Sequence, residues 1–392
     1  MSFFENIKEV PNDEGLFSDA FEKDTRKDKI NSSIGMIYNE EGAIKELSFI
    51  KEVEIELFNK NLNKEYSTLL GLQDFNSSVF KLFFPNEELV EGGNFFCIQS
   101  STGGSALRIG SDLLRQNLSN DIYVSDPTFS MYKYLFSQCN IKHYPYYNKE
   151  NKSLDFDGFV TFLNHLPEQQ VISIQVSNHN PTGLDLNEKQ WEILASVFQK
   201  KNHFAFFDCA YLGYSTGNFE KDLFGVHTFL KNKVEFFLAY SSAKTTLNYS
   251  DDIGALMGWL NDTETVKNVL SNLAVINRSY YSFASLQGAR IVDYFLRYKK
   301  TDLEKEINSI VLSLNDKREF IIKLLLEKKV NKKTVDLIKN QKGIYLFLDL
   351  NSDQIEKLKS EHAVYLSEYG RANLSSLNKT NIERFVEAYY SE

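Results

Sequence analysis

The stretch QVISIQVSNHNPTGLDLNEKQWEILASVFQKKNHFAFFDCAY, residues 170–211, decides the fold class of this chain. It begins and ends with short runs, 170–177 and 203–211, that are largely apolar, as is typical of strands buried on both faces of a sheet. Between them, residues 187–201 carry the pattern of an amphipathic helix. A strand, a helix and a second strand in this order predict a parallel sheet wrapped by helices.

The same alternation extends in both directions from this unit. Further strand-like runs lie at 94–100, 121–127, 140–147 and 234–242, and helical patterns lie at 103–118 and 154–166. After residues 254–261 the chain becomes helical, and its C-terminal part resembles a smaller unit of mixed helix and strand. The predicted fold class is therefore α/β, with a mostly parallel central sheet wrapped by helices and a smaller α+β domain.

Composition and charge narrow the classes of function. The chain has 392 residues and a net charge of −9, which argues against a nucleic-acid partner, because such binding needs clustered Lys and Arg. No apolar run reaches the roughly 18–20 residues of a membrane span, and no signal segment is found at the N-terminus. We therefore expect a cytoplasmic protein without a membrane partner. The six histidines show no metal-ligand spacing, and we expect Cys97, Cys139 and Cys209 to be buried free thiols.

Polar segments follow the apolar runs at the points where the predicted strands end. Ligands of open α/β sheets bind outside the carboxyl ends of the strands, so we expect five segments to converge: 100–107, 126–129, 177–183, 208–211 and 241–244. Each segment alone is also explained by a tight turn, a cap or a surface lysine. Together they offer a helix N-terminus, an aromatic ring, an amide, a carboxylate, a phenol and an amine. These groups suit pyridoxal phosphate bound to a lysine.

In their order and spacing these segments resemble the class I aspartate aminotransferases, pyridoxal phosphate enzymes of fold type I. The matching motifs are Asn-Pro-Thr-Gly (180–183), Asp-Cys-Ala-Tyr (208–211), Ser-Ser-Ala-Lys (241–244) and Tyr-Gly-Arg-Ala-Asn (369–373). The resemblance runs from residue 10 almost to the C-terminus. It implies a homodimer with shared active sites, whose chain is divided into an N-terminal arm (1–11), a small domain (12–44 with 312–392) and a large cofactor-binding domain (45–311).

The resemblance also implies a role for each matching residue. Lys244 is the Schiff-base lysine and proton shuttle, and Asp208 is the partner of the protonated pyridine nitrogen. The remaining cofactor contacts that it implies are Tyr211 and Asn180 on the ring oxygen, Phe129 on the ring face, and Thr102, Gly103, Gly104, Ser241 and, across the dimer interface, Tyr66 at the phosphate. The implied substrate contacts are Arg371 for the α-carboxylate, Arg278 of the other subunit for a side-chain carboxylate, and Gly35.

These roles predict a reaction and its substrates. A planar guanidinium donates two hydrogen bonds to a carboxylate, so two arginines at opposite ends of a site select a dicarboxylic amino acid. We expect an aminotransferase that moves the amino group of aspartate or glutamate to a 2-oxo acid such as 2-oxoglutarate. Asp208 would keep the ring nitrogen protonated, which makes the cofactor an electron sink, and Lys244 would move the substrate proton as a general base.

The family pattern is broken at Asp252. The family places an arginine eight residues after the lysine, where it forms a bidentate salt bridge to the cofactor phosphate, and the ungapped equivalent here is Asp252. At ~4 Å and an effective dielectric of 20, one unit-charge contact is worth about 4 kcal/mol before desolvation. We therefore expect weakened phosphate binding. The helix start also reads Thr-Gly-Gly-Ser instead of Ser-Gly-Thr-Gly, and the family's Asn-Pro-Pro is Phe-Ala-Ser at 283–285.

This departure leaves other functions open. One is transamination of an aromatic amino acid, a second is another fold type I reaction such as that of a lyase or decarboxylase, and a third is a catalytically silent descendant kept for binding or assembly. The retention of a lysine, a carboxylate, an amide, a phenol and two arginines favours an enzyme, because a silent scaffold has no physical need for a buried amine facing a carboxylate.

Overall fold

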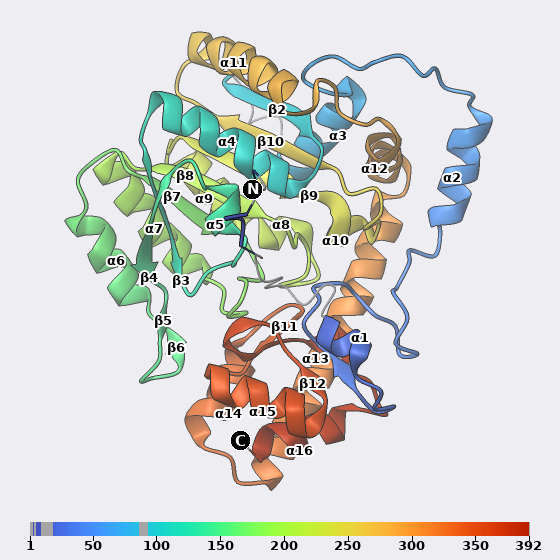
Figure 1. The fold of residues 1–392 in the computed structure, drawn as a ribbon. Coiled ribbons are helices and arrows are strands. Elements are labelled where there is room, and N and C mark those ends of the chain that lie inside the picture. Colours follow the sequence, from blue (N-terminus) through green and yellow to red (C-terminus); the bar gives the residue numbers. More distant parts are fainter. Residues whose placement is uncertain (1–2, 4, 9–18, 86–92, 392) are drawn as a thin grey trace.

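A seven-stranded sheet forms the centre of the computed structural model, which describes residues 3, 5–8, 19–85 and 93–391 (Figure 1). Its strands lie in the order β2 (Phe95–Ser100), β10 (Gly254–Trp259), β9 (Phe236–Ser241), β8 (Phe204–Cys209), β7 (Val171–Gln175), β3 (Asp121–Asp126) and β4 (Asn140–Pro145). Neighbours from β9 to β4 are parallel, whereas β10 is antiparallel to both β2 and β9. The predicted α/β fold with a mostly parallel sheet is confirmed.

Helices cover both faces of this sheet. One face packs against α4 (Gly103–Asn117) and α11 (Thr263–Tyr281). The helices beside the other face are α3 (Gln73–Phe83), α6 (Phe156–His165), α7 (Glu188–Lys201) and α9 (Phe224–Lys231). Side chains alternate along a strand, so Phe206 enters the core beneath α4 while Phe207 enters the opposite core. Two covered faces explain why the strands are apolar throughout.

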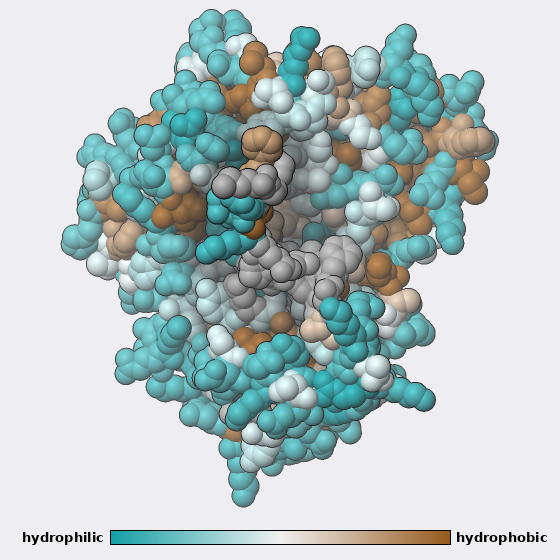
Figure 2. Space-filling view, viewed as in Figure 1, coloured by the Kyte–Doolittle hydropathy of each residue, from teal (hydrophilic) through white to brown (hydrophobic). Residues whose placement is uncertain are grey.

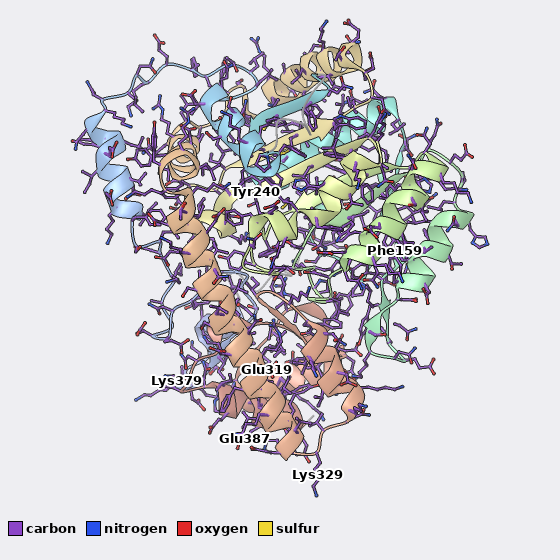
Figure 3. The ribbon with its side chains drawn as sticks, turned by 180° about the vertical axis from the view of Figure 1, so that it is seen from behind. Phe159, Tyr240, Glu319, Lys329, Lys379 and Glu387 are labelled. Carbon is purple, nitrogen blue, oxygen red and sulfur yellow. The ribbon has the colours of Figure 1, made fainter. Side chains whose placement is uncertain are left out.

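The 28-residue helix α13 (Lys300–Glu327) leads from the sheet to the C-terminal part, which Figure 3 shows from behind with Glu319, Lys329 and Glu387 labelled. Its elements are α14 (Lys332–Asn340), β11 (Tyr345–Phe347), α15 (Ser352–His362), β12 (Val364–Tyr365), β13 (Arg371–Asn373) and α16 (Ile382–Tyr390). Strand β1 (Ile30–Asn31) pairs in parallel with β12, which ties the N-terminal segment to this part. The domain bounds stay a prediction, and residues 1–2, 4 and 9–11 of the predicted arm, with 12–18 of the predicted small domain, lie outside the described residues.

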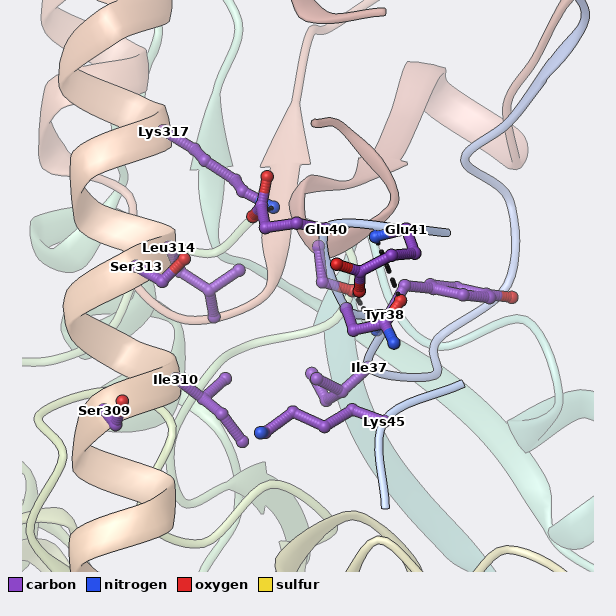
Figure 4. A pocket seen from close by; sticks show the side chains of 12 residues that line it. Ile37, Tyr38, Glu40, Glu41, Lys45, Ser309, Ile310, Ser313, Leu314 and Lys317 are labelled. Carbon is purple, nitrogen blue, oxygen red and sulfur yellow. Dashed lines mark hydrogen bonds and ion pairs between the residues drawn. The ribbon is translucent and has the colours of Figure 1, made fainter. Parts of the chain in front are cut away.

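Residues 37–45 lie against α13 and enclose a cavity of about 320 Å³ with it (Figure 4). Two ion pairs hold this segment, Lys317 Nζ to Glu40 at 2.8 Å and Lys45 Nζ to Glu306 at 3.4 Å. The backbone N–H of Ile37 also donates to the Tyr249 hydroxyl at 2.9 Å. The contacts fix the chain directly after Gly35, which the sequence analysis assigns to the substrate site.

The remaining elements are short or peripheral. They are α1 (Asp19–Lys23), α2 (Ile50–Asn59), α5 (Tyr132–Leu135), α8 (Phe219–Asp222), α10 (Ser242–Thr246), α12 (Gln287–Tyr298), β5 (Tyr147–Asn148), β6 (Ser153–Leu154) and two 3-10 turns at Glu368–Gly370 and Leu374–Ser376. Among the described residues, no helix is long and apolar enough to cross a membrane. All three cysteines are free, but Cys97 and Cys139 are only partly buried because they lie at an edge strand and in a loop.

Candidate active site

A cavity of about 220 Å³ lies where strands β7, β8 and β9 end and helix α4 begins. Its lining includes most of the residues that the sequence assigned to a cofactor site. The full lining is Gly103, Gly104, Leu107, Phe129, Met131, Leu135, Gln175, Asn180, Asp208, Ala210, Tyr211, Ser241, Lys244 and Asp252. The polar segments at the strand ends therefore converge at the carboxyl edge of the sheet.

Lys244 enters the cavity from helix α10, which begins directly after β9. Its Nζ lies 5.9 Å from the centroid of the Tyr211 ring, and its backbone carbonyl accepts a hydrogen bond of 2.8 Å from the Tyr214 hydroxyl. Leu247 ends α10 in the left-handed conformation (φ 51°), so the helix carries this lysine and then turns back into the sheet. The side chain is half-buried, which leaves its amine accessible from the cavity.

Asp208 is the carboxylate at the end of β8. Burial raises the pKa of Asp208 to about 6, whereas a hydrogen bond from the Tyr132 hydroxyl and the charge of Lys244 act to lower this pKa. The Tyr132 hydroxyl donates to Asp208 Oδ2 at 2.6 Å. Sequence reasoning missed Tyr132, although it stands only three residues after Phe129, and its place in the four-residue helix α5 offered no motif.

Asn180 and Arg371 form the edge of the site. Arg371 donates from Nη1 to Asn180 Oδ1 at 2.7 Å and from Nη2 to the Ser33 carbonyl at 2.8 Å. The guanidinium lies 4.6 Å from the Tyr345 ring centroid and is buried, and its Nε has no hydrogen-bond partner among the described residues. Gln175, which sequence reasoning did not single out, holds the Asn180 backbone through bonds of 2.7 and 2.9 Å.

Three residues from distant parts of the chain meet beside Asn180. The hydroxyls of Tyr211 and Tyr345 are hydrogen-bonded to each other. A Cβ atom on Gly35 would lie 2.8 Å from the Tyr345 hydroxyl and 3.0 Å from that of Tyr211, so this position has no room for a side chain. Gly35 therefore brings bare backbone close to the site. Tyr345 was not predicted as a site residue, because it lies in an apolar run that reads as a core strand.

The start of helix α4 forms the opposite end of the cavity. Thr102 is the N-cap: its hydroxyl accepts from the Ser105 N–H at 3.0 Å, and its own N–H donates to Ser105 Oγ at 2.7 Å. Thr102 itself is not part of the lining, whereas Gly103 and Gly104 are. A Cβ on Gly103 would lie 2.5 Å from Ser241 Cβ, so the absence of a side chain lets the helix start approach the end of β9.

Asp252 lies at this same end. Its Oδ1 accepts hydrogen bonds from Ser241 Oγ at 3.1 Å and from the Ala243 N–H at 3.2 Å. Burial raises the pKa of the Asp252 carboxyl, and the charge of Lys244 with these hydrogen bonds acts to lower it. The acidic side chain therefore faces the cavity that it lines and uses two donors of the β9–α10 turn.

Two predicted residues lie away from this cavity. Tyr66 is 83% exposed and stacks on Phe283 with ring centroids 4.6 Å apart. Arg278 is exposed in the last turn of α11. Neither lines the cavity of its own chain. In the part of the chain that the structure describes, no three His, Cys, Asp or Glu side chains are grouped as metal ligands.

Comparisons with known proteins agree over almost the whole chain. The family model described as aminotransferase class I and II matches residues 27–388. The mitochondrial aspartate aminotransferase of Schizosaccharomyces pombe is 31% identical, over 95% of this chain and 86% of that protein. The aspartate aminotransferase of Pseudomonas aeruginosa is 30% identical, over 99% of each. A crystal structure of an aromatic-amino-acid aminotransferase from Burkholderia pseudomallei, covalently bound to pyridoxal phosphate, matches with a TM-score of 0.94 at 27% identity, over 100% of this chain and 99% of that one.

Proposed function

The chain belongs to the family of class I and II aminotransferases, and we propose that it uses pyridoxal phosphate to move the amino group of aspartate or glutamate to a 2-oxo acid such as 2-oxoglutarate. The family makes the chain an aminotransferase, as its sequence predicted. The names of the relatives from S. pombe and P. aeruginosa support a dicarboxylic substrate. The bound cofactor named for the B. pseudomallei structure supports pyridoxal phosphate.

One observation carries the proposal: an amine, a carboxylate, an amide and a phenol line a single cavity at the strand ends. Pyridoxal phosphate supplies an electron sink for the charge left when the substrate Cα loses its proton. The residues that would hold it are Asp208 at the ring nitrogen, Asn180 and Tyr211 at the ring oxygen, Phe129 on the ring face, Lys244 at the carbonyl carbon, and Gly103, Gly104 and Ser241 at the phosphate. The bare helix start beside Ser241 leaves room for that phosphate.

Lys244 and Asp208 carry the proton chemistry. With a pKa of about 6 for its carboxyl, Asp208 is ionised above neutral pH and can hold a proton on a ring nitrogen. The Tyr132 hydroxyl orients this carboxylate from the side opposite the ring. The Lys244 amine reaches the same cavity, where it removes the proton from the substrate Cα as a general base and returns it at the neighbouring carbon.

Arg371 would bind the substrate α-carboxylate. Its guanidinium is buried and fixed by Asn180 and Ser33, yet one donor, Nε, has no partner among the described residues. An unpaired buried donor is costly, and a carboxylate satisfies it with a charge-assisted hydrogen bond. Gly35 and the paired hydroxyls of Tyr211 and Tyr345 limit the space beside it, which orients the amino acid.

The remaining predicted contacts would come from a second copy of the chain. Tyr66 and Arg278 are exposed and do not line their own cavity, as expected of residues that complete a partner's site. Apolar side chains of α2 and the residues after it also face solvent in the single chain, with Ile55 62% and Phe58 84% exposed. Figure 2 shows hydrophobic surface at this edge of the molecule. A homodimer that covers this edge is therefore part of the proposal.

An aromatic amino acid is the second candidate substrate. The B. pseudomallei protein, whose fold matches with a TM-score of 0.94, is named an aromatic-amino-acid aminotransferase. The two candidates differ at the distal end of the substrate, where only aspartate and glutamate present a carboxylate. They can therefore be separated at Arg278, the residue assigned to that group.

Replacement of Arg278 by alanine tests the substrate class. Loss of a charge-assisted hydrogen bond of about 1.5–3 kcal/mol lowers kcat/KM roughly 10- to 150-fold, and we expect this loss for aspartate and glutamate. Phenylalanine and tyrosine should change less than about threefold, since they offer no distal carboxylate to the guanidinium. The control is Lys267→Ala, which removes an exposed cation from the same helix and should change neither class. Equal losses for all substrates, or higher wild-type activity with the aromatic ones, would overturn the dicarboxylate proposal.

A further inference from the structure

The inference concerns the end of the cavity that would hold the cofactor phosphate, and it rests on the proposed function. Three chain segments meet there: the helix start at Gly103, the end of β9 at Ser241 and the loop that carries Asp252. The loop is held close, because a Cβ on Gly254 would lie 2.2 Å from the Thr102 carbonyl oxygen. Asp252 is therefore a fixed part of this end of the cavity.

The Asp252 carboxylate already occupies donors that an anion would use. Its Oδ1 accepts from Ser241 Oγ at 3.1 Å and from the Ala243 N–H at 3.2 Å. A phosphate that entered here would compete with the carboxylate for both donors. The first turn of α4 still offers amides that have no partner within the helix, and these favour an anion only moderately.

The charges around this end oppose a dianion. Lys244 is the one cationic side chain among the described residues that line the cavity, and the proposed function assigns it to the carbonyl carbon. The same lining holds two carboxylates, Asp208 and Asp252. Arg108, which is also on α4, points elsewhere: it bonds to the Tyr280 hydroxyl at 3.0 Å and to Ser137 Oγ at 2.8 Å.

We infer that Asp252 takes the place of an anionic group at the phosphate end, so that the chain holds its cofactor through the ring and gains little affinity from a phosphate dianion. The site then accepts pyridoxal, the same aldehyde without its phosphate, about as well as pyridoxal phosphate. Asp252 is the residue that sets this preference, because it contributes a like charge and withdraws two donors.

The test measures the ratio of two dissociation constants, for pyridoxal and for pyridoxal phosphate. Each is obtained from a visible-absorption titration of the cofactor-stripped, full-length protein. Both ligands share the ring and the aldehyde, so the ratio isolates the phosphate. In the wild-type protein we expect a ratio within about tenfold of one. In Asp252→Asn, which keeps the size of the side chain but removes its charge, the ratio should shift roughly 5- to 1000-fold toward pyridoxal phosphate.

Two further variants sharpen the result. Asp252→Arg should shift the ratio in the same direction and further than the asparagine variant, since it supplies a cation. Asp251→Asn removes the same charge one residue away, from a side chain that does not line the cavity, and should leave the ratio unchanged. A wild-type ratio above about a thousandfold in favour of pyridoxal phosphate, or equal ratios in wild type and Asp252→Asn, would overturn the inference.

Failure of the proposed function looks different. If the chain is not a pyridoxal phosphate enzyme, neither ligand produces the absorption change, and Lys244→Ala behaves like the wild type with both. If only the role of Asp252 is wrong, both ligands bind in the wild type, Lys244→Ala loses the absorption change, and the ratio alone fails to respond to the Asp252 variants.

Discussion

Asp208 is placed in conflict between stability and function. Burial raises the pKa of its carboxyl to about 6, above the ~3.9 of an unfolded chain. Between these two values the folded protein binds more protons than the unfolded one, so the free energy of unfolding falls as pH rises through about 4 to 6 and stays low above. The carboxylate that the reaction needs is therefore expected to destabilise the ligand-free protein at neutral pH.

Asp208→Asn should relieve this destabilisation. The amide removes the charge and keeps an oxygen that accepts from the Tyr132 hydroxyl. Without cofactor, we expect the variant to be more stable than wild type at pH 8, by at most about 3 kcal/mol, and equally stable near pH 4, although it loses activity. Denaturation at both pH values measures this difference. As a control of opposite sign, Asp121→Asn should lose stability at pH 8, because Lys142 lowers the pKa of Asp121. An unchanged stability of Asp208→Asn at pH 8 would contradict the argument.

Sequence predicted the residues of the site that stand at strand ends and missed those that reach it through packing. Asp208 and Lys244 follow apolar runs, so their position at the sheet edge could be deduced from the pattern alone. Tyr345 reaches Tyr211 from 134 positions further along the chain, and Tyr132 belongs to a helix of four residues. No local pattern encodes either contact. The hydrogen bonds that Asp252 accepts from Ser241 and Ala243 were equally beyond a sequence comparison.

At the scale of the elements, strand order depended on more than periodicity. The runs that became β7, β8 and β9 were predicted because both faces of the sheet are covered. The antiparallel direction of β10 was not, since an apolar run has no direction until its two neighbours are known. Helix starts were more readable. Thr102 with Ser105 and Asn187 with Gln190 both form capping boxes, at α4 and at α7.

These two capping boxes provide a matched pair of variants. Thr102→Ala and Asn187→Ala should each lower stability by about 0.5–2 kcal/mol, because each leaves an N–H of the first turn unpaired. Only α4 presents its first turn, at Gly103 and Gly104, to the cavity. We therefore expect Thr102→Ala alone to weaken cofactor binding, by about two- to tenfold. Thermal unfolding and the absorption titration measure the two effects. Equal cofactor affinities in both variants would mean that the order of the α4 first turn does not matter for binding.

At the scale of the whole molecule, the site depends on parts of the chain that lie far apart in sequence. Gly35 comes from the N-terminal segment, Tyr345 and Arg371 come from the C-terminal part, and the cavity itself is built on the sheet. Arg371 links the first two through the Ser33 carbonyl, and it links to the sheet through Asn180. A single chain thus assembles the ring end and the α-carboxylate end. The contacts assigned to Tyr66 and Arg278 are the ones that it leaves incomplete.

Mixing two inactive variants tests whether these contacts are supplied by the partner subunit. Lys244 lies in its own chain's cavity, whereas Arg278 is proposed to act in the cavity of the partner. A dimer of one Lys244→Ala chain and one Arg278→Ala chain then contains one complete site and one doubly defective site. Random exchange makes half of the dimers hybrids, so activity toward aspartate should recover to about a quarter of the wild-type value. The measurement is activity after unfolding and refolding the mixture.

The control pair replaces two residues that line the same chain's cavity. Lys244→Ala mixed with Asp208→Ala yields hybrids in which each site lacks one of the two groups, so no recovery is expected. Hybrid formation is verified by mass on differently tagged chains, which separates failed exchange from failed complementation. If hybrids form and Lys244→Ala with Arg278→Ala recovers no more activity than the control pair, Arg278 does not act across the interface. The selectivity for a distal carboxylate would then need a cation from the same chain, although Lys244 is the one cation among the described residues that line its cavity.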